Sequence, residues 1–136
     1  MLVKNHIKVS LKVTDFLCSS SEITNVLGFL PTKIWEKGDI VHPKAENLHK
    51  QNGWIFSKED RLEKRSVHEI SMRLLLEIGE KIENFSLLPD ECEIEFSCVI
   101  YVYTHIPEIN LPSKLVEKLA KIGCSLDFDV YYFCEE

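Results

Sequence analysis

A strand–helix–strand pattern occurs twice in this chain and limits the possible folds more than any other feature. In residues 7–28, an alternating apolar and polar strand leads into a serine cluster, a short helix and a glycine. In residues 92–134, an alternating strand leads into Pro112, a helix ending at Gly123 and another alternating strand. Alternation with period two is typical of strands that bury one face. The pattern therefore predicts a sheet whose strands bury one face beneath helices.

Two predicted helices begin at capping-box motifs, in which a serine precedes a glutamate by three residues. The first box is Ser19 with Glu22, and Gly28 is a suitable left-handed end for the helix that follows. The second is Ser66 with Glu69, and apolar spacing predicts a helix to about residue 85. We expect Gly79, inside that helix, to let it lie close to the sheet.

Residues 32–57 are the least regular part of the chain. They are expected to form a hairpin or a long loop, with Trp35 and Trp54 packed near each other. Long loops of this kind are often functional, so residues 38–53 are a candidate contact region.

The element order β-α-β-β-α-β-α-β predicts an α+β fold. The expected architecture is a mainly antiparallel sheet with helices packed on one face, and duplicated β-α units in a ferredoxin-like layout. The length of 136 residues predicts a single domain spanning residues 1–136.

The composition excludes several classes of protein. No apolar run approaches the ~20 residues that a membrane span requires, and the amino terminus lacks the pattern of a signal peptide. The five cysteines are odd in number and include no close pair, which is a poor disulfide framework. We therefore expect a cytoplasmic protein whose strand cysteines are small buried hydrophobes.

The negative charge lies in the last third of the chain. Residues 1–86 hold 13 Lys+Arg and 12 Asp+Glu, a net of +1, whereas residues 87–136 hold 3 and 10, a net of −7. Such a field repels nucleic acid and anionic membranes and attracts basic partners.

Carboxylates are the richest chemical feature. Acids alternate on one side of each of two predicted strands, and aromatic residues continue the same rows. If these strands are neighbours, they form one surface. The candidate partner-binding residues are Glu91, Glu93, Glu95, Tyr103, Asp127, Asp129 and Tyr131. A solvated sheet face, a docking surface for a basic protein and a paired-carboxylate hydrolase site are all consistent with this pattern.

Motifs for other chemistry are missing from the sequence. There is no metal-binding motif, no nucleophile elbow and no phosphate-binding glycine loop. His42 and His49 share the irregular loop, and Cys18 precedes a helix start. All three are consistent with ordinary loop residues that bind no metal and carry no catalytic role. No cofactor and no metal are expected.

Several segments carry a family resemblance, and they lie in the same order as in that family. They are Glu22–Thr32, Lys37–Asp39, Gly53–Ser57, Leu111–Leu115, Ile122–Gly123 and Leu126–Tyr131. Together they resemble the opening and closing motifs of the domain of unknown function 4279 family. The resemblance implies a small, single-domain bacterial protein and supplies no catalytic residue. Stand-alone proteins of this kind resemble the immunity partners of bacterial toxins.

Three functions remain open from the sequence. The first is a non-enzymatic protein-binding domain, a toxin-neutralising immunity protein that blocks a cationic toxin through its acidic surface. The alternative is a small-molecule-binding or hydrolytic domain with a pocket under the loop of Trp35 and Trp54. The third is an oligomeric domain that associates through an exposed strand edge.

Overall fold

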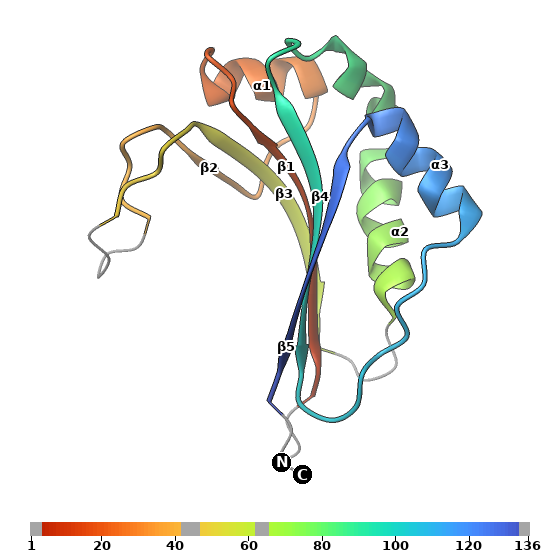
Figure 1. Ribbon diagram of the computed structural model, residues 1–136. Coiled ribbons are helices and arrows are strands. Elements are labelled where there is room, and N and C mark those ends of the chain that lie inside the picture. The colour runs from red at the N-terminus through yellow and green to blue at the C-terminus, as the bar shows by residue number, and fades with distance from the viewer. Residues whose placement is uncertain (1–3, 42–46, 62–65, 134–136) are drawn as a thin grey trace.

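The computed structural model describes residues 4–41, 47–61 and 66–133. The described residues form a five-stranded sheet, three α-helices and one 3₁₀ helix, η1. Figure 1 shows α2 and α3 on one side of the sheet and α1 across one end. In chain order the elements are β1 (His6–Thr14), α1 (Ser20–Leu27), β2 (Lys33–Trp35), β3 (Gly53–Asp60), α2 (Val67–Ile78), η1 (Gly79–Leu87), β4 (Glu93–Val102), α3 (Ser113–Ile122) and β5 (Ser125–Tyr132).

The strand order is β2-β3-β1-β4-β5. Three neighbouring pairs are antiparallel, and β4 pairs with β5 in parallel. This confirms the predicted α+β class with a mainly antiparallel sheet. The two strand–helix–strand units differ in pairing, because β5 lies directly beside β4, whereas β3 lies between β1 and β2.

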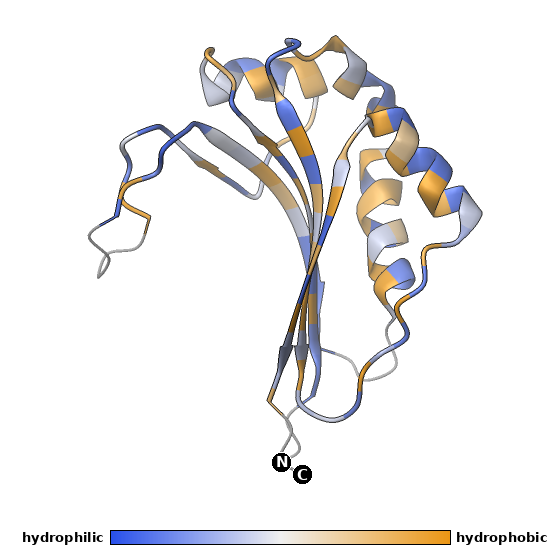
Figure 2. Cartoon of the chain, viewed as in Figure 1, coloured by the Kyte–Doolittle hydropathy of each residue, from blue (hydrophilic) through white to orange (hydrophobic). Residues whose placement is uncertain are grey.

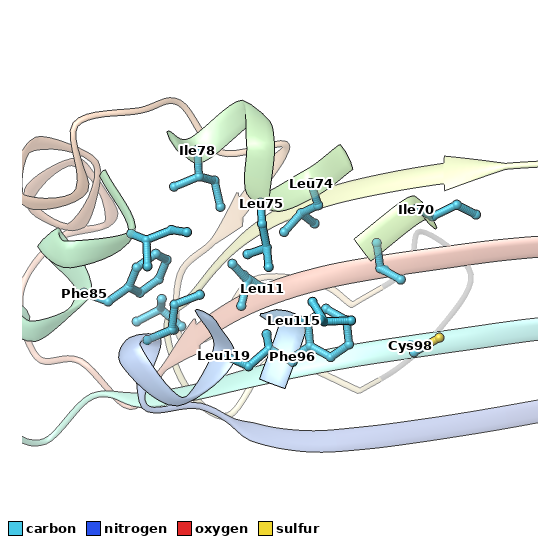
Figure 3. Packing of buried hydrophobic residues seen from close by; sticks show 14 of the residues in the cluster. Leu11, Ile70, Leu74, Leu75, Ile78, Phe85, Phe96, Cys98, Leu115 and Leu119 are labelled. Atoms are coloured by element: carbon cyan, nitrogen blue, oxygen red, sulfur yellow. The ribbon is translucent and has the colours of Figure 1, made fainter. Parts of the chain in front are cut away.

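The core lies between the sheet and the helices. Val9, Leu11 and Val13 of β1 are fully buried, as their alternation with polar residues predicts. Figure 2 shows hydrophobic residues recurring along the strands and along the helices that cover them. Figure 3 shows side chains from α2, α3 and η1 gathered around Leu11 and Phe96 of the central strands. All 23 buried hydrophobic residues belong to one cluster, so the described chain has one core.

Both predicted capping boxes begin a helix. The Ser19 hydroxyl accepts a hydrogen bond from the backbone N–H of Glu22 at 3.3 Å, and the Ser66 hydroxyl accepts one from Glu69 at 3.4 Å. Gly28 ends α1 with a φ of 82°, in the left-handed conformation that its position predicted.

The prediction of a continuous helix to about residue 85 was wrong. Gly79 adopts a φ of 60° and a ψ of −133°, which ends α2, and a 3₁₀ helix follows. A side chain at Gly79 would meet no atom within 4 Å. Glycine therefore suits this position because of its backbone conformation, and not because the helix approaches the sheet closely here.

Candidate protein-binding face

The sheet face that points away from the helices, the outer face, carries the residues that alternate with the core. On β1 these are Lys8, Ser10 and Lys12. Their direct neighbours on β4 are Val99, Ser97 and Glu95. Residues opposite each other on paired strands share a face, so register alone places the outer-face side chains of all five strands.

The predicted acidic residues of β4 and β5 meet on this face. The parallel register pairs Glu95 with Ser125, Ser97 with Asp127 and Val99 with Asp129. The carboxylates are therefore staggered, with Glu93 and Glu95 toward the start of β4 and two aspartates farther along β5. Asp127 and Asp129 are both exposed.

Glu91 lies outside this group, contrary to the expectation that it shares one side of the strand with Glu93 and Glu95. The strand begins at Glu93, and Glu91 belongs to the turn before it. The backbone N–H of Cys92 donates to the Pro89 carbonyl at 3.0 Å, which closes that turn. The alternation of glutamates continues through the turn, so no local pattern indicates where the strand starts.

Aromatic rings continue the same surface beyond the acids. The Tyr101 ring stacks on His6 at 5.4 Å between centroids and on Tyr131 at 5.5 Å. Phe133 stacks on Tyr103 at 5.0 Å and lies 6.4 Å from Tyr101. The interplanar angles are between 14° and 21°, so the five rings form an ordered row. The acidic–aromatic strip is defined here as Glu93, Glu95, Asp127, Asp129, Tyr101, Tyr103, Tyr131 and Phe133.

Asn5 holds one end of this row in place, a role that sequence reasoning missed. Its side-chain carbonyl accepts hydrogen bonds from the backbone N–H groups of Tyr103 at 2.7 Å and Thr104 at 3.1 Å. Its amide donates to the carbonyl of His105 at 2.7 Å. Asn5 is 4% exposed. A lone asparagine ahead of a strand carries no pattern that would have indicated these contacts, which span about a hundred positions of sequence.

The outer face is not acidic throughout. Lys8, Lys12 and Lys33 occupy β1 and β2, so the basic side chains lie beside the acidic ones on the same sheet. Lys12 Nζ lies 3.9 Å from Glu95 Oε1, where the two halves meet. The carboxylates that the sequence predicted lie on β4 and β5, and Glu59 of β3, which pairs with Lys8 and lies 2.7 Å from His6, is a further acid on this face.

The two tryptophans lie on opposite faces, so the expectation that they pack together was wrong. Trp54 pairs with Ile34 across β3 and β2, whereas Trp35 pairs with Gly53. Trp54 is fully buried on the helix side, and its indole N–H donates to the Thr24 hydroxyl at 3.0 Å. Trp35 instead lies on the outer face.

A groove of about 620 Å³ lies beside Trp35 on the outer face. The ring of His49 stacks on Trp35 at 4.8 Å between centroids. The lysine groove is defined by its lining residues Lys8, Lys12, Thr32, Lys33, Trp35, Val41, His49, Ile55 and Ser57. Trp54 does not contribute to it, so the pocket predicted under both tryptophans is a groove beside one of them.

The candidate loop of residues 38–53 is partly described. Ile40 and Leu48 form an isolated antiparallel bridge, and the backbone N–H of His49 donates to Asp39 at 2.8 Å. His42, which shares this loop with His49, lies outside the described residues. Within the described part of the chain, no three His, Cys, Asp or Glu side chains are grouped so as to hold a metal ion.

Over the ranges that the structure covers, no helix is both long and apolar enough to cross a lipid bilayer.

Comparisons with known proteins identify the family. Neither a search of curated proteins nor a search of solved structures found a match to this chain. The family model described as "Domain of unknown function (DUF4279)" matches residues 5–133 of the 136 residues. The match includes every described strand and helix, and the chain therefore belongs to the DUF4279 family.

Proposed function

We propose that this chain is a non-enzymatic protein-binding domain that docks a basic partner on the acidic–aromatic strip. The observation that carries the proposal is the meeting of four carboxylates and a row of stacked rings on two neighbouring strands. Carboxylates steer a cationic partner toward the surface, and aromatic side chains are frequent energetic anchors of interfaces. The strip combines both on a sheet face that lies opposite the helices.

Exposure favours binding over catalysis at this strip. Asp127 and Asp129 are exposed, and the Glu95 side chain is 36% exposed. A hydrolase that uses paired carboxylates generally holds one of them in an apolar environment that keeps it protonated. Solvated carboxylates are better suited to charge-steered association.

The specific form proposed is a bacterial immunity protein that neutralises a cationic toxin by occluding its active site. The family resemblance of the sequence and the acidity of the strip support this form. The odd number of cysteines, with no close pair, supports action in the cytoplasm. Residues 38–53 are proposed as a second contact, since the described parts of this loop, residues 38–41 and 47–53, extend from the β2–β3 end of the sheet (Figure 1).

Co-expression with the product of the adjacent gene tests this function. The expected result is a stoichiometric complex that dissociates as the salt concentration rises, together with relief of the partner's toxicity. Tyr131→Ala with Tyr103→Ala should weaken the complex by about tenfold or more, because interface aromatics often act as hot spots. Leu76→Ala is the matched control, since Leu76 is a 68% exposed apolar residue of α2. Equal effects of both changes would contradict the proposed surface.

The lysine groove supports a second candidate function, the binding of a small anionic ligand with a planar ring. Lys8 and Lys33 line the groove, and neither forms an ion pair with another described residue, although Glu59 lies opposite Lys8 on β3. The Trp35–His49 stack offers a flat apolar surface. Inorganic phosphate and an aromatic carboxylate are suitable probes. Saturable binding that is lost in Lys33→Gln would favour this candidate, and unchanged affinity in that variant would contradict it.

We also propose that the fold has a ferredoxin-like layout and arose by duplication. The order β2-β3-β1-β4, with every neighbouring pair antiparallel, supports a ferredoxin-like layout to which α3 and β5 are added. The shared strand–helix order of the two units supports an origin by duplication.

A further inference from the structure

β5 forms one edge of the sheet and leaves part of its backbone without a strand neighbour. It pairs with β4, and no described strand lies on its other side. Phe133, just beyond β5, donates its backbone N–H to Val102 at 2.8 Å. In a parallel ladder, alternate residues direct their backbone groups toward the same neighbour. The backbone groups of Leu126, Phe128 and Val130 therefore face the open edge.

This edge has few of the features that usually protect exposed strands. Natural edges are protected by charged side chains, especially lysine, and by proline, bulges or short length, and the only charges on β5 are Asp127 and Asp129. β5 has eight residues, contains no lysine or proline, and pairs with β4 in an unbroken register. The opposite edge strand, β2, has three residues.

The side chains of β5 are also unusually apolar for an exposed strand. Leu126 and Val130 point toward the helix side, yet each is 48% exposed. Their direction follows the alternation of the strand, but the helices do not cover them. A strand added beside β5 would bury part of both residues.

The charges on β5 indicate whether a second copy of β5 or a different strand pairs with its open edge. In a two-fold antiparallel pair, residues that share a face lie opposite each other. The two registers with the greatest overlap place Asp129 opposite Asp129, or Asp127 opposite Asp129. Like charges directly opposite each other destabilise a strand pair. Self-association is therefore disfavoured, and a strand with cations at these positions is favoured.

We propose that the edge of β5 takes up an extended segment of the basic partner in which lysine or arginine alternates with apolar residues. The cations lie on the outer face opposite Asp127 and Asp129. The apolar side chains lie on the helix side, beside Leu126 and Val130. Main-chain hydrogen bonds to β5 provide affinity, and the alternating side chains provide specificity. This inference rests on the proposed protein-binding function and specifies the mode of contact.

Synthetic peptides test the pairing directly on the wild-type protein. The probe is a fluorescent, end-capped peptide of about eight residues, the length of β5, in which lysine alternates with valine. A peptide of the same composition with its lysines in one block is the control. Fluorescence anisotropy at low salt should show the alternating peptide binding about tenfold more tightly, a difference that corresponds to about 1.4 kcal/mol.

Two N-methylated versions of the alternating peptide separate backbone pairing from charge attraction. One is methylated at every lysine amide and the other at every valine amide. Only one of these sets faces β5 in a paired strand, so one version should lose binding and the other should retain it. If both versions bind like the unmodified peptide, the proposed pairing is wrong.

Protein variants distinguish the failure of this inference from the failure of the proposed function. Val130→Pro removes an edge N–H that makes no bond to β4, and it should weaken binding of the alternating peptide. Asp127→Asn with Asp129→Asn should weaken binding of every cationic peptide. Sensitivity to the aspartates, with equal binding of alternating and block peptides, would overturn edge pairing and leave the acidic docking surface intact. No saturable binding of the alternating peptide, or no effect of the aspartates, would overturn the edge proposal and count against the docking function.

Discussion

Gly53 shows how a single residue positions the outer face. A Cβ atom built at Gly53 would lie 1.9 Å from the Trp35 ring, so the indole occupies the space that any side chain would need. The glycine allows Trp35 to lie flat against β3 and to form one wall of the lysine groove. A strand glycine often marks such a close approach.

Replacing this glycine should destabilise the fold through Trp35. Gly53→Ala is expected to cost about 1–3 kcal/mol in the free energy of unfolding, because the new methyl group displaces the indole. In a Trp35→Ala background the same change should cost much less. Urea unfolding of the four proteins in this double-mutant cycle measures the coupling. A cost that is equal in both backgrounds would contradict the contact.

The buried thiol of Cys98 should make the free energy of unfolding depend on pH in alkaline solution. Burial raises the pKa of the Cys98 thiol from 9.0 to about 12. Above pH 9, the unfolded chain loses this proton while the folded chain keeps it. The contribution to stability is therefore complete below pH 9 and decreases as the pH rises toward 12.

Comparison with Cys98→Ala isolates this effect from the other titrating groups. Between pH 9 and 12, the free energy of unfolding of the wild type should fall more steeply, by up to about 1.4 kcal/mol per pH unit. Denaturant unfolding across this range measures both slopes. Parallel curves for the two proteins would show that the thiol ionises equally in both states.

At the scale of elements, local signals in the sequence predicted most helix starts and strand faces. The capping boxes and the period-two alternation depend on neighbouring residues, and both predictions are confirmed. Gly79 was misread because an isolated glycine in a helical pattern does not reveal its φ. The 3₁₀ helix that follows keeps part of the same apolar spacing, with Ile82 and Phe85 buried.

Long-range pairing limited the prediction of the candidate site. The sequence indicated that the acids of β4 and β5 share faces, but their meeting depended on strand order. The side of the sheet occupied by each tryptophan depends on the register of β2 against β3. Lys12 reaches the acidic half only because β1 pairs with β4. No local pattern contains this information.

The side chain of Ser66 should stabilise the start of α2. Ser66→Ala removes the acceptor for the backbone N–H of Glu69 and should cost about 1 kcal/mol in stability. Ser113→Ala is the control, because Pro112 caps α3 without a side-chain hydrogen bond. Thermal unfolding compares the two variants. Equal losses would indicate that the Ser66 hydroxyl does not act as a cap.

Across the whole molecule, sequence position and strand order together separate the charges. The acidic last third of the chain supplies β4 and β5, and the more balanced first part supplies the lysines of β1 and β2. The outer face therefore carries four carboxylates on its β4–β5 half and three lysines on β1 and β2, with Glu59 of β3 opposite Lys8. A basic partner should approach the β4–β5 half, and its association should slow as salt screens these charges.

The most direct test of this account is the rate of association of two charge-reversed variants with the partner obtained in the co-expression experiment. Asp127→Lys with Asp129→Lys reverses charge on the strip. Glu80→Lys with Glu117→Lys makes the same net change at exposed positions of η1 and α3. The account predicts that the first variant associates about tenfold or more slowly and with little dependence on salt, whereas the second stays close to the wild type. Equal slowing of both variants, or wild-type rates for the first, would contradict binding through the acidic–aromatic strip.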